Sequence, residues 1–498
     1  MSLALIYSRA RLGIDAPLVT VEVHLSNGLP GLSIVGMPET AVKESKDRVR
    51  SAILNSHLEF PARRITVNLA PADLPKEGGR FDLAIALGIL AASGQIPAEG
   101  LENYEFIAEL ALSGDTRQVD AALPAALACG RAGHQLIIAA ANAAEAALSR
   151  QTRVYPADNL LQVCAHLHQR EFLFQHSVDI ASLPPQGEDL REVKGQYQAK
   201  RALEVAAAGG HNLLFYGPPG TGKSMLAHRL PGILPPLDED EAIEVAALYS
   251  ITSSARRHHW FERPFRSPHH TTSAIALAGG GSNPRPGEIS LAHHGVLFLD
   301  ELPEFSRAVL EVLREPLENG AVSISRARAQ VVYPARFQLI AAMNPCPCGY
   351  HGSERCQCSG EQVRRYRQKI SGPLLDRIDM HIPVRALKSG EIHQPASGDS
   401  SELIRQRVIA ARARQMQRQG KLNRALSAAE LERYVPLDAA GQQLLDQSME
   451  KLGLSARAMH RVLKLALTLA DLQQKERPDL QCLAEALGYR TLDRVLHQ

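Results

Sequence analysis

Residues that could bind a phosphate group occur together in one run, Gly217-Pro218-Pro219-Gly220-Thr221-Gly222-Lys223-Ser224. Glycines let a backbone turn tightly, so that its N–H groups can point at phosphate oxygens. Lys223 can reach the β- and γ-phosphates of a nucleotide, and the Ser224 hydroxyl can hold Mg²⁺. The apolar run 213–216 precedes this loop and a helix-like run, 225–230, follows it. The pattern is that of a P-loop and predicts ATP and Mg²⁺ as cofactors.

Acidic and amide groups that could support hydrolysis follow two later apolar runs. Residues 296–299 are apolar and are followed by Asp300 and Glu301, which are costly to bury unless a cation or water meets them. Asp300 would hold Mg²⁺ through the coordination shell of the ion, and Glu301 would polarise the attacking water. The run 337–343 ends in Asn344, which could orient that water, although it could also be a simple turn residue. This series resembles the AAA+ ATPases.

Two arginines match positions that act at a nucleotide in AAA+ proteins. Arg377 lies in the segment 374–379, which resembles the part of an AAA+ module that presents an arginine to the neighbouring subunit's nucleotide. The alternative is a salt bridge with an adjacent aspartate. Arg457 opens a helix that we expect to point back at the nucleotide, as sensor 2 does, with Arg461 as the second choice.

Basic residues that could contact DNA occur in two insertions. The Gly-rich run 278–287 carries Arg285 and resembles the helix-2 insertion of magnesium-chelatase-like and MCM-like AAA+ proteins, which faces the ring pore. Two alternating runs within 321–333 predict a β-hairpin with Arg326 and Arg328 at its tip. Arginines there could contact phosphates without reading sequence, or the hairpin could simply be solvated. We interpret the nearby His pairs, 269–270 and 293–294, as structural, because adjacent residues of a strand point in different directions.

Four of the seven cysteines are clustered, at Cys346, Cys348, Cys356 and Cys358. Thiolates so close together favour tetrahedral Zn²⁺ in a structural role; an iron–sulfur cluster and free or redox thiols are the alternatives. The odd total and the cluster indicate a reducing cytoplasm rather than a disulfide framework. No apolar run approaches the length of a membrane span, and the N-terminus lacks the pattern of a secretory signal. The net charge of +2 gives no general attraction to nucleic acid, so a DNA surface would have to be local.

These residues are expected within an α/β chain of 498 residues with several domains. Residues 1–171 predict an α+β domain, and 172–190 a linker. Residues 191–387 predict the AAA+ core with the cysteine insert at 346–358. A second linker at 388–401 leads to a helical lid at 402–498. The N-terminal strands are expected at 18–25, 32–36 and 64–69, with helices at 44–55 and 83–92; the lid helices are expected at 402–419, 428–434, 439–452, 455–474 and 480–487.

The N-terminal domain resembles the protease domain of Lon, a ribosomal S5 domain 2-like fold. The run 75–82 corresponds to the loop that carries the catalytic serine, and 114–133 to the segment that carries its lysine. The two catalytic positions fall on Arg80 and Leu123, so the nucleophile and its base are both missing. We therefore expect a protease-like fold without protease chemistry, used for assembly or docking.

Taken together and over essentially the full length, these parts resemble the ComM/YifB family of magnesium-chelatase-like AAA+ ATPases. The resemblance implies a homo-oligomeric ring, a hexamer, that uses ATP to drive branch migration of DNA during natural transformation. It implies single-stranded and branched DNA as partners. One departure is Leu467, where we expect the family to have arginine. Two other classes compete: a metal-insertion ATPase that needs partner subunits, and an ATP-dependent protease, which lacks its dyad here. Stimulation of ATP turnover by DNA would separate the first class from the others.

Overall fold

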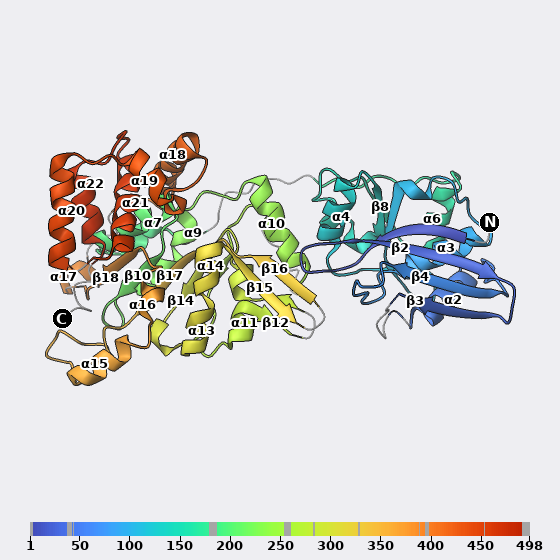
Figure 1. The fold of residues 1–498 in the computed structure, drawn as a ribbon, viewed down its shortest axis with the longest axis horizontal. Helices are drawn as coiled ribbons and strands as arrows, with labels where there is room; N and C mark the ends of the chain where they lie inside the picture. Colours follow the sequence, from blue (N-terminus) through green and yellow to red (C-terminus); the bar gives the residue numbers. More distant parts are fainter. Residues whose placement is uncertain are drawn as a thin grey trace.

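The computed structural model describes residues 3–36, 42, 44–178, 187–252, 260–281, 284–326, 329–387, 389–393, 398–452 and 454–490. It is elongated, with the N-terminal domain at one end, a second α/β domain in the middle and the C-terminal helices at the other end (Figure 1). Among the described helices, none is both long and apolar enough to cross a membrane.

The N-terminal domain is built on a seven-stranded mixed sheet with the order β3-β4-β2-β1-β5-β8-β9. Its strands are β1 (Leu3–Arg9), β2 (Leu18–Ser26), β3 (Gly31–Val35), β4 (Arg64–Ala70), β5 (Tyr104–Ile107), β8 (Gln135–Ala139) and β9 (Val154–Ala157). The three predicted strands and both predicted helices, α2 (Ser45–Asn55) and α3 (Asp82–Ala92), are present. Helix α3 is buried along its whole length, because every residue after its first is apolar or glycine. The remaining elements are β6 (Glu109–Leu110), β7 (Thr116–Arg117), α4 (Ala122–Arg131), α5 (Ala143–Ala146) and α6 (Leu160–Leu167).

The middle domain contains a five-stranded sheet in which every pairing is parallel. Its order is β11-β14-β17-β10-β18. The strands are β10 (Leu213–Tyr216), β11 (Phe265–Arg266), β14 (Val296–Leu299), β17 (Gln338–Met343) and β18 (Met380–Pro383). Since the carboxyl ends of parallel strands meet at one edge, the loops that follow β10, β14 and β17 lie together. We call the side of the sheet at which the carboxyl ends of the strands lie the carboxyl edge, and the side at which their amino ends lie the amino edge.

Alternating side chains of these strands enter two separate cores. On one face, Leu213 and Phe215 pack with α7 (Tyr197–Gly209), α8 (Lys223–His228), α9 (Leu230–Ile233) and the C-terminal helices. On the other face, Leu214 packs among residues of the segments that follow α9. These segments include α10 (Glu239–Ser250), α11 (Ala274–Ala278), α12 (Glu288–Leu291), α13 (Arg307–Val312) and α14 (Arg314–Asn319).

Two antiparallel hairpins project from this second face, on the side that faces the N-terminal domain (Figure 1). One pairs β12 (Gly279–Gly280) with β13 (Arg285–Pro286), and the other pairs β15 (Ala321–Arg326) with β16 (Ala329–Pro334). The hairpins touch, because the Tyr333 hydroxyl donates to the Pro284 carbonyl at 2.8 Å. The tip of the second hairpin, 327–328, lies outside the described residues.

The C-terminal part is helical, and the five predicted helices are present. They are α18 (Ser401–Gln419), α19 (Ala428–Tyr434), α20 (Ala439–Leu452), α21 (Ala456–Leu472) and α22 (Leu480–Gly488). Ser400 and Ser455 begin α18 and α21, since each side chain accepts a backbone N–H of the first turn. Two short helices, α15 (Gly360–Arg367) and α16 (Gly372–Leu375), precede β18. A third, α17 (Ser389–Ile392), lies within the stretch that we expected to be only a linker.

The C-terminal helices are anchored at the amino edge by the end of α7. The last carbonyls of a helix have no partner within it and need donors from elsewhere. Arg412 Nη2 donates to Ala207 O at 2.7 Å, and Gln415 Nε2 donates to Ala208 O at 3.2 Å. Side chains of α18 therefore complete α7 and fix the helical part against the edge opposite the P-loop.

The N-terminal domain contacts the middle domain through α4 and α10. The Ala121 N–H donates to the Ser250 carbonyl at 3.0 Å, and Ser250 Oγ also bonds Glu145. Ala121 is buried in the same core as Leu248 and Ile251 of the middle domain. The two domains are thus joined by apolar packing as well as hydrogen bonds.

Candidate nucleotide site

The loop between β10 and α8 has the backbone that its glycines permit. Gly220 and Gly222 have φ of +74° and +88°, which side-chain-bearing residues rarely adopt. Thr221 Oγ1 donates to the Pro218 carbonyl at 3.0 Å and closes the turn. Nothing lies within 4 Å of a Cβ built on Gly220 or Gly222, so the loop is open on the side where a phosphate would lie.

Lys223 is the first residue of α8 and folds back over the loop. Its Nζ donates to the carbonyls of Gly217 and Pro218, both at 2.8 Å, and to Asn344 Oδ1 at 3.2 Å. Burial lowers the pKa of Lys223, and the nearby Asp300 works in the opposite direction. The lysine and the amide after β17, predicted to act on one nucleotide, are thus in direct contact.

The acidic residues after β14 lie beside the same loop. Ser224 Oγ donates to Asp300 Oδ2 at 2.5 Å. Glu301 has a φ of +52°, unusual for a residue with a side chain, and its N–H donates to Asp300 Oδ1 at 2.9 Å. The Glu301 carboxylate is half exposed and lies 3.2 Å from His270 Nδ1. Glu301 is therefore held by an imidazole as well as by its strained backbone.

These residues fit a nucleotide with Mg²⁺. The open loop supplies backbone N–H groups and Lys223 a cation, which suit phosphate oxygens. The hydroxyl of Ser224 and the carboxylate of Asp300 are hard oxygen ligands of the kind that Mg²⁺ prefers. Lys223 would exchange loop carbonyls for phosphate oxygens on binding, and Asn344 would then be released toward the γ-phosphate. When bound, Mg²⁺ and ATP supply the reactive phosphoryl group and its charge neutralisation.

Arg377 lies at the amino edge, away from this loop. It precedes β18, whose first residue, Met380, pairs with Leu213 at the start of β10. The strand therefore separates Arg377 from the P-loop, which follows the other end of β10. The guanidinium donates to the Pro373 carbonyl at 2.8 Å and pairs with Glu318, and neither neighbouring aspartate is its partner. Arg377 cannot serve its own chain's nucleotide from this position.

Arg457 and Arg461 lie near Arg377 and not near their own P-loop. Arg457 is exposed at the start of α21, and its charge contributes to lowering the pKa of Glu318, behind the dominant hydrogen bond from Arg377. Arg461 Nε lies 3.7 Å from Asp379 Oδ1. The start of α21 therefore lies at the amino edge, and the role of Arg457 at a nucleotide stays a prediction. Leu467 is fully buried in the same helix.

The four clustered cysteines converge after β17. Cys346 Sγ lies 3.4 Å from Cys348 Sγ and 4.0 Å from Cys356 Sγ, and the last two sulfurs are 3.8 Å apart. With Cys358 they form a group whose sulfur atoms all lie within 4.8 Å. A tetrahedral zinc site with Zn–S bonds of about 2.3 Å has sulfurs about 3.8 Å apart. The set fits Zn²⁺.

The cysteine loop also touches the P-loop. A Cβ built on Gly349 would lie only 2.7 Å from Pro219 Cδ, so the two loops are in close contact. Cys346 follows Asn344 closely in the chain, and Arg367 Nε donates to the intervening Pro345 carbonyl at 3.4 Å. The cluster therefore supports two parts of the nucleotide site.

Family models match most of the chain. The model described as magnesium chelatase, subunit ChlI, covers residues 189–392. Two others, described as subunit ChlI of Mg-chelatase and its C-terminal part, cover 21–142 and 398–490.

Full-length relatives are more informative. The chain is 52% identical to YifB of Salmonella typhimurium over 100% of its length and 98% of the relative. It is also 52% identical to the competence protein ComM of Haemophilus influenzae, over 100% of this chain and 99% of the relative. The chain belongs to the ComM/YifB family of magnesium-chelatase-like AAA+ ATPases. A more distant relative, the magnesium-chelatase 38 kDa subunit of Cereibacter sphaeroides, is 26% identical over 31% of this chain and 51% of the relative.

Of the three arginines predicted to contact DNA in this ComM/YifB protein, only Arg285 has its side chain among those that the structure describes. Arg285 is exposed on β13. Arg326 ends β15, but its side chain is not among those described, and Arg328 lies outside the described residues. The basic hairpin tip stays a prediction.

Two contacts were missed from the sequence, one at the nucleotide site and one at the amino edge. His270 was interpreted as structural, yet it lies against Glu301; its position just after β11 at the carboxyl edge was the available signal. His293 and His294 were expected to point apart. Instead both place Nε2 2.8 Å from the same Glu244 oxygen, because they lie in a turn before β14 and not in a strand.

The Glu244 group nevertheless fits a structural role better than a metal site. His293 Nδ1 accepts the Arg336 N–H at 3.0 Å, so in the neutral ring Nε2 carries the proton and donates to Glu244. That nitrogen has no free lone pair for a metal. Burial lowers the pKa of His293 to about 4, which keeps the ring neutral near pH 7.

Proposed function

We propose that the chain is an ATPase that assembles into a hexameric ring and uses ATP hydrolysis to drive branch migration of DNA. Single-stranded and branched DNA would be its substrates, in natural transformation or homologous recombination in the cytoplasm. The observation that carries the proposal is mechanical. Leu297 and Leu299 of β14 share a core with Ile324 of the β15 hairpin, and Asp300 directly follows β14. A change at the nucleotide can therefore move a hairpin that bears arginines.

Ring assembly is supported by where Arg377 lies. Charge that spreads over the γ-phosphate during transfer is offset by a guanidinium. Arg377 is at the amino edge and the P-loop follows the carboxyl edge, so a complete site needs the loop of one chain and Arg377 of the next. Arg457 and Arg461, close to Arg377, would act on the same neighbouring nucleotide.

The DNA role is supported by the competence relative and by the hairpins. Arg285, Arg326 and Arg328 would contact backbone phosphates from the two touching hairpins. The test is branch migration by purified protein with and without ATP. The Arg326→Ala, Arg328→Ala double variant should keep basal ATPase activity but lose strand exchange, and its DNA affinity should depend less on salt. Arg63→Ala, an exposed arginine of the N-terminal domain, is the control. Branch migration at the full rate by the double variant would refute the proposal that these arginines contact DNA.

A second candidate is a magnesium-chelatase-like subunit that acts on a metal-insertion or protein partner. The family models and the 26% identical chelatase subunit favour it. Single-stranded DNA should then leave ATP turnover unchanged, whereas the proposed motor should be stimulated.

We assign structural roles to the remaining parts. The four cysteines would hold one Zn²⁺ that braces the nucleotide site. The N-terminal domain would be a Lon-like docking module, because the dyad positions carry Arg80 and Leu123, both buried. The domain limits 1–171, 191–387 and 402–498 stay predictions. ATP-stimulated cleavage of casein by rigorously purified protein would contradict the assignment of a docking module.

A further inference from the structure

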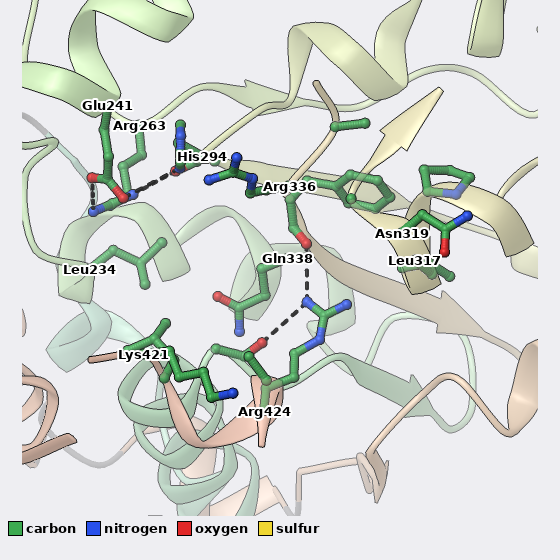
Figure 2. A pocket seen from close by; sticks show the side chains of 18 of the residues that line it. Leu234, Glu241, Arg263, His294, Leu317, Asn319, Arg336, Gln338, Lys421 and Arg424 are labelled. Atoms are coloured by element: carbon green, nitrogen blue, oxygen red, sulfur yellow. Dashed lines mark hydrogen bonds and ion pairs between the residues drawn. The ribbon is translucent and has the colours of Figure 1, made fainter. Parts of the chain in front are cut away.

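A pocket lies at the amino edge of the middle sheet, on the side opposite the P-loop. Its floor is formed by residues that precede four of the five strands, and α14 and the C-terminal segment close it (Figure 2). We call it the amino-edge pocket. Residues of the C-terminal segment that line it are Arg412, Met416, Lys421, Leu422, Arg424 and Ala425. It is therefore distinct from the site built by Lys223, Asp300 and Asn344.

The pocket carries an excess of positive charge. Five cationic side chains line it, from Arg263, Arg336, Arg412, Lys421 and Arg424, against the two carboxylates of Glu241 and Glu318. Both carboxylates are already paired. Glu241 lies 2.8 Å from Arg263, and Glu318 is paired with Arg377, which does not line the pocket.

Part of this charge serves the fold. Arg412 donates to Ala207 O, and Arg424 Nη1 donates to Gly210 O and Phe337 O at 3.3 and 3.1 Å. These bonds satisfy carbonyls at the end of α7 and the start of β17, and they use only part of each guanidinium. Burial lowers the pKa of both arginines, and the charges of Glu241 near Arg412 and of Asp379 near Arg424 offset only part of this effect.

Arg336 and Lys421 take no part in these hydrogen bonds to backbone carbonyls. In the described part of the chain, no ion pair or hydrogen bond is found for the Arg336 guanidinium, which is exposed at the pocket wall. Lys421 is paired with Glu430 at 2.8 Å, outside the pocket lining. In Figure 2, Arg336 extends from the strand side of the pocket, and Lys421 and Arg424 extend from its C-terminal side. Cations from two parts of the chain therefore line one pocket, and the two carboxylates that line it are paired with Arg263 and Arg377.

The volume of the pocket and the residues that line it indicate which class of ligand fits. The pocket encloses about 560 Å³, within the roughly 300–1,000 Å³ of small-molecule sites. Leu234, Leu317, Phe337 and Met416 supply apolar wall beside the cations. Guanidinium groups match phosphate geometry with paired hydrogen bonds. We propose that the amino-edge pocket binds a phosphate-bearing small molecule of nucleotide size, with Arg336, Lys421 and Arg424 on its phosphates.

The test uses the full-length Lys223→Ala variant, whose P-loop no longer supports nucleotide binding, and pyrophosphate as the probe in titration calorimetry. We expect saturable binding at one site per chain. Adding Arg336→Gln or Lys421→Gln should weaken it by about tenfold or more, the value of one charge-assisted hydrogen bond. Arg63→Gln, which removes an exposed arginine far from the pocket, should leave the affinity unchanged. Arg424→Gln is avoided because that side chain also caps α7.

Competition then identifies the source of the phosphate. ATP or ADP should displace pyrophosphate, and a single-stranded oligonucleotide at equal phosphate concentration should not. Displacement by the oligonucleotide alone would overturn the proposal in favour of a nucleic-acid contact. Absence of saturable binding, or equal loss in Arg336→Gln and Arg63→Gln, would overturn it outright. Thermal unfolding of the Arg336→Gln protein should match its parent, since that guanidinium makes no hydrogen bond or ion pair with the described residues.

Discussion

Mixing two inactive variants tests whether each nucleotide site is shared by two chains. The four-residue strand β10 separates the sheet edges by roughly 13 Å, at about 3.3 Å per residue. Arg377 lies before one edge and the phosphates would lie beyond the other, so Arg377 would act only in a neighbouring site. Arg377→Ala should bind ATP normally but lose turnover by about 10³-fold or more, as with other arginine fingers.

The ATPase activity that mixing the two variants should restore can be calculated. Arg377→Ala keeps an intact P-loop, and Lys223→Ala keeps an intact Arg377. In randomly mixed rings with heterologous interfaces, about one quarter of the interfaces combine an intact loop with an intact arginine. Equal mixing of the two proteins should therefore restore ATPase activity to about a quarter of wild type per chain, if the sites act independently. Mixing Arg377→Ala with Arg63→Ala, which should behave as the wild type, measures how completely subunits exchange between rings. Normal turnover by pure Arg377→Ala, or no recovery despite proven exchange, would refute the shared site.

Three further outcomes follow from the same geometry. Lys223→Ala should abolish binding of a fluorescent ATP analogue, whereas Glu301→Gln should bind it and not hydrolyse ATP; normal turnover by Glu301→Gln would remove that residue from its role. Elemental analysis should find one zinc per chain, and Cys348→Ser should lower the unfolding temperature and weaken ATP binding, because the cysteine loop contacts Pro219; zinc-free protein with unchanged stability would contradict this. Hydrogen bonds from His293 and His294 lower the pKa of Glu244 from 4.5 to about 2, so its stabilising effect is present above pH 4.5 and fades as the pH falls toward 2. The difference in unfolding temperature between wild type and Glu244→Gln should therefore shrink below pH 4.5, and Asp240→Asn, an exposed neighbour on α10, should show no such difference; a constant gap would be the opposing result.

The parts that the sequence predicted are those fixed by local pattern. Alternation predicted β2 and β4, and an uninterrupted apolar run predicted α3. The carboxyl edge could be assembled from the sequence, because polar residues after parallel strands must meet. Lys223 and Asn344 are separated widely in the chain and are in contact for that reason.

What the sequence could not predict depends on how whole elements pack. Periodicity identified α21, but it carries no information about which edge of the sheet the helix covers. Hydrogen bonds from α18 to the end of α7 decide that, and they involve Arg412 and Gln415, which read as ordinary residues of a polar helix. The His270 contact with Glu301 has the same origin, since a two-residue strand such as β11 is too short for a pattern to reveal.

The placement of the helical part has a consequence for how a ring would respond to ATP. Burial works to raise the pKa of Asp379, but His211, Arg461, Arg424 and a backbone hydrogen bond from Asn212 together lower it, so the carboxyl stays ionised at the amino edge. Arg461 lies beside Asp379 and Arg377 is paired with Glu318, but Arg461 Nη1 and Arg377 Nε are buried without a hydrogen-bond partner among the described residues. Such an edge is stabilised when an anion arrives from outside the chain, and a neighbour's γ-phosphate is one that disappears on hydrolysis. The C-terminal helices would thus sense the nucleotide of the next subunit and not their own. Each hydrolysis event would loosen the contact across one interface while the local P-loop, Ser224 and Asp300 remain in place, which is the asymmetry that a ring needs to move a strand in one direction.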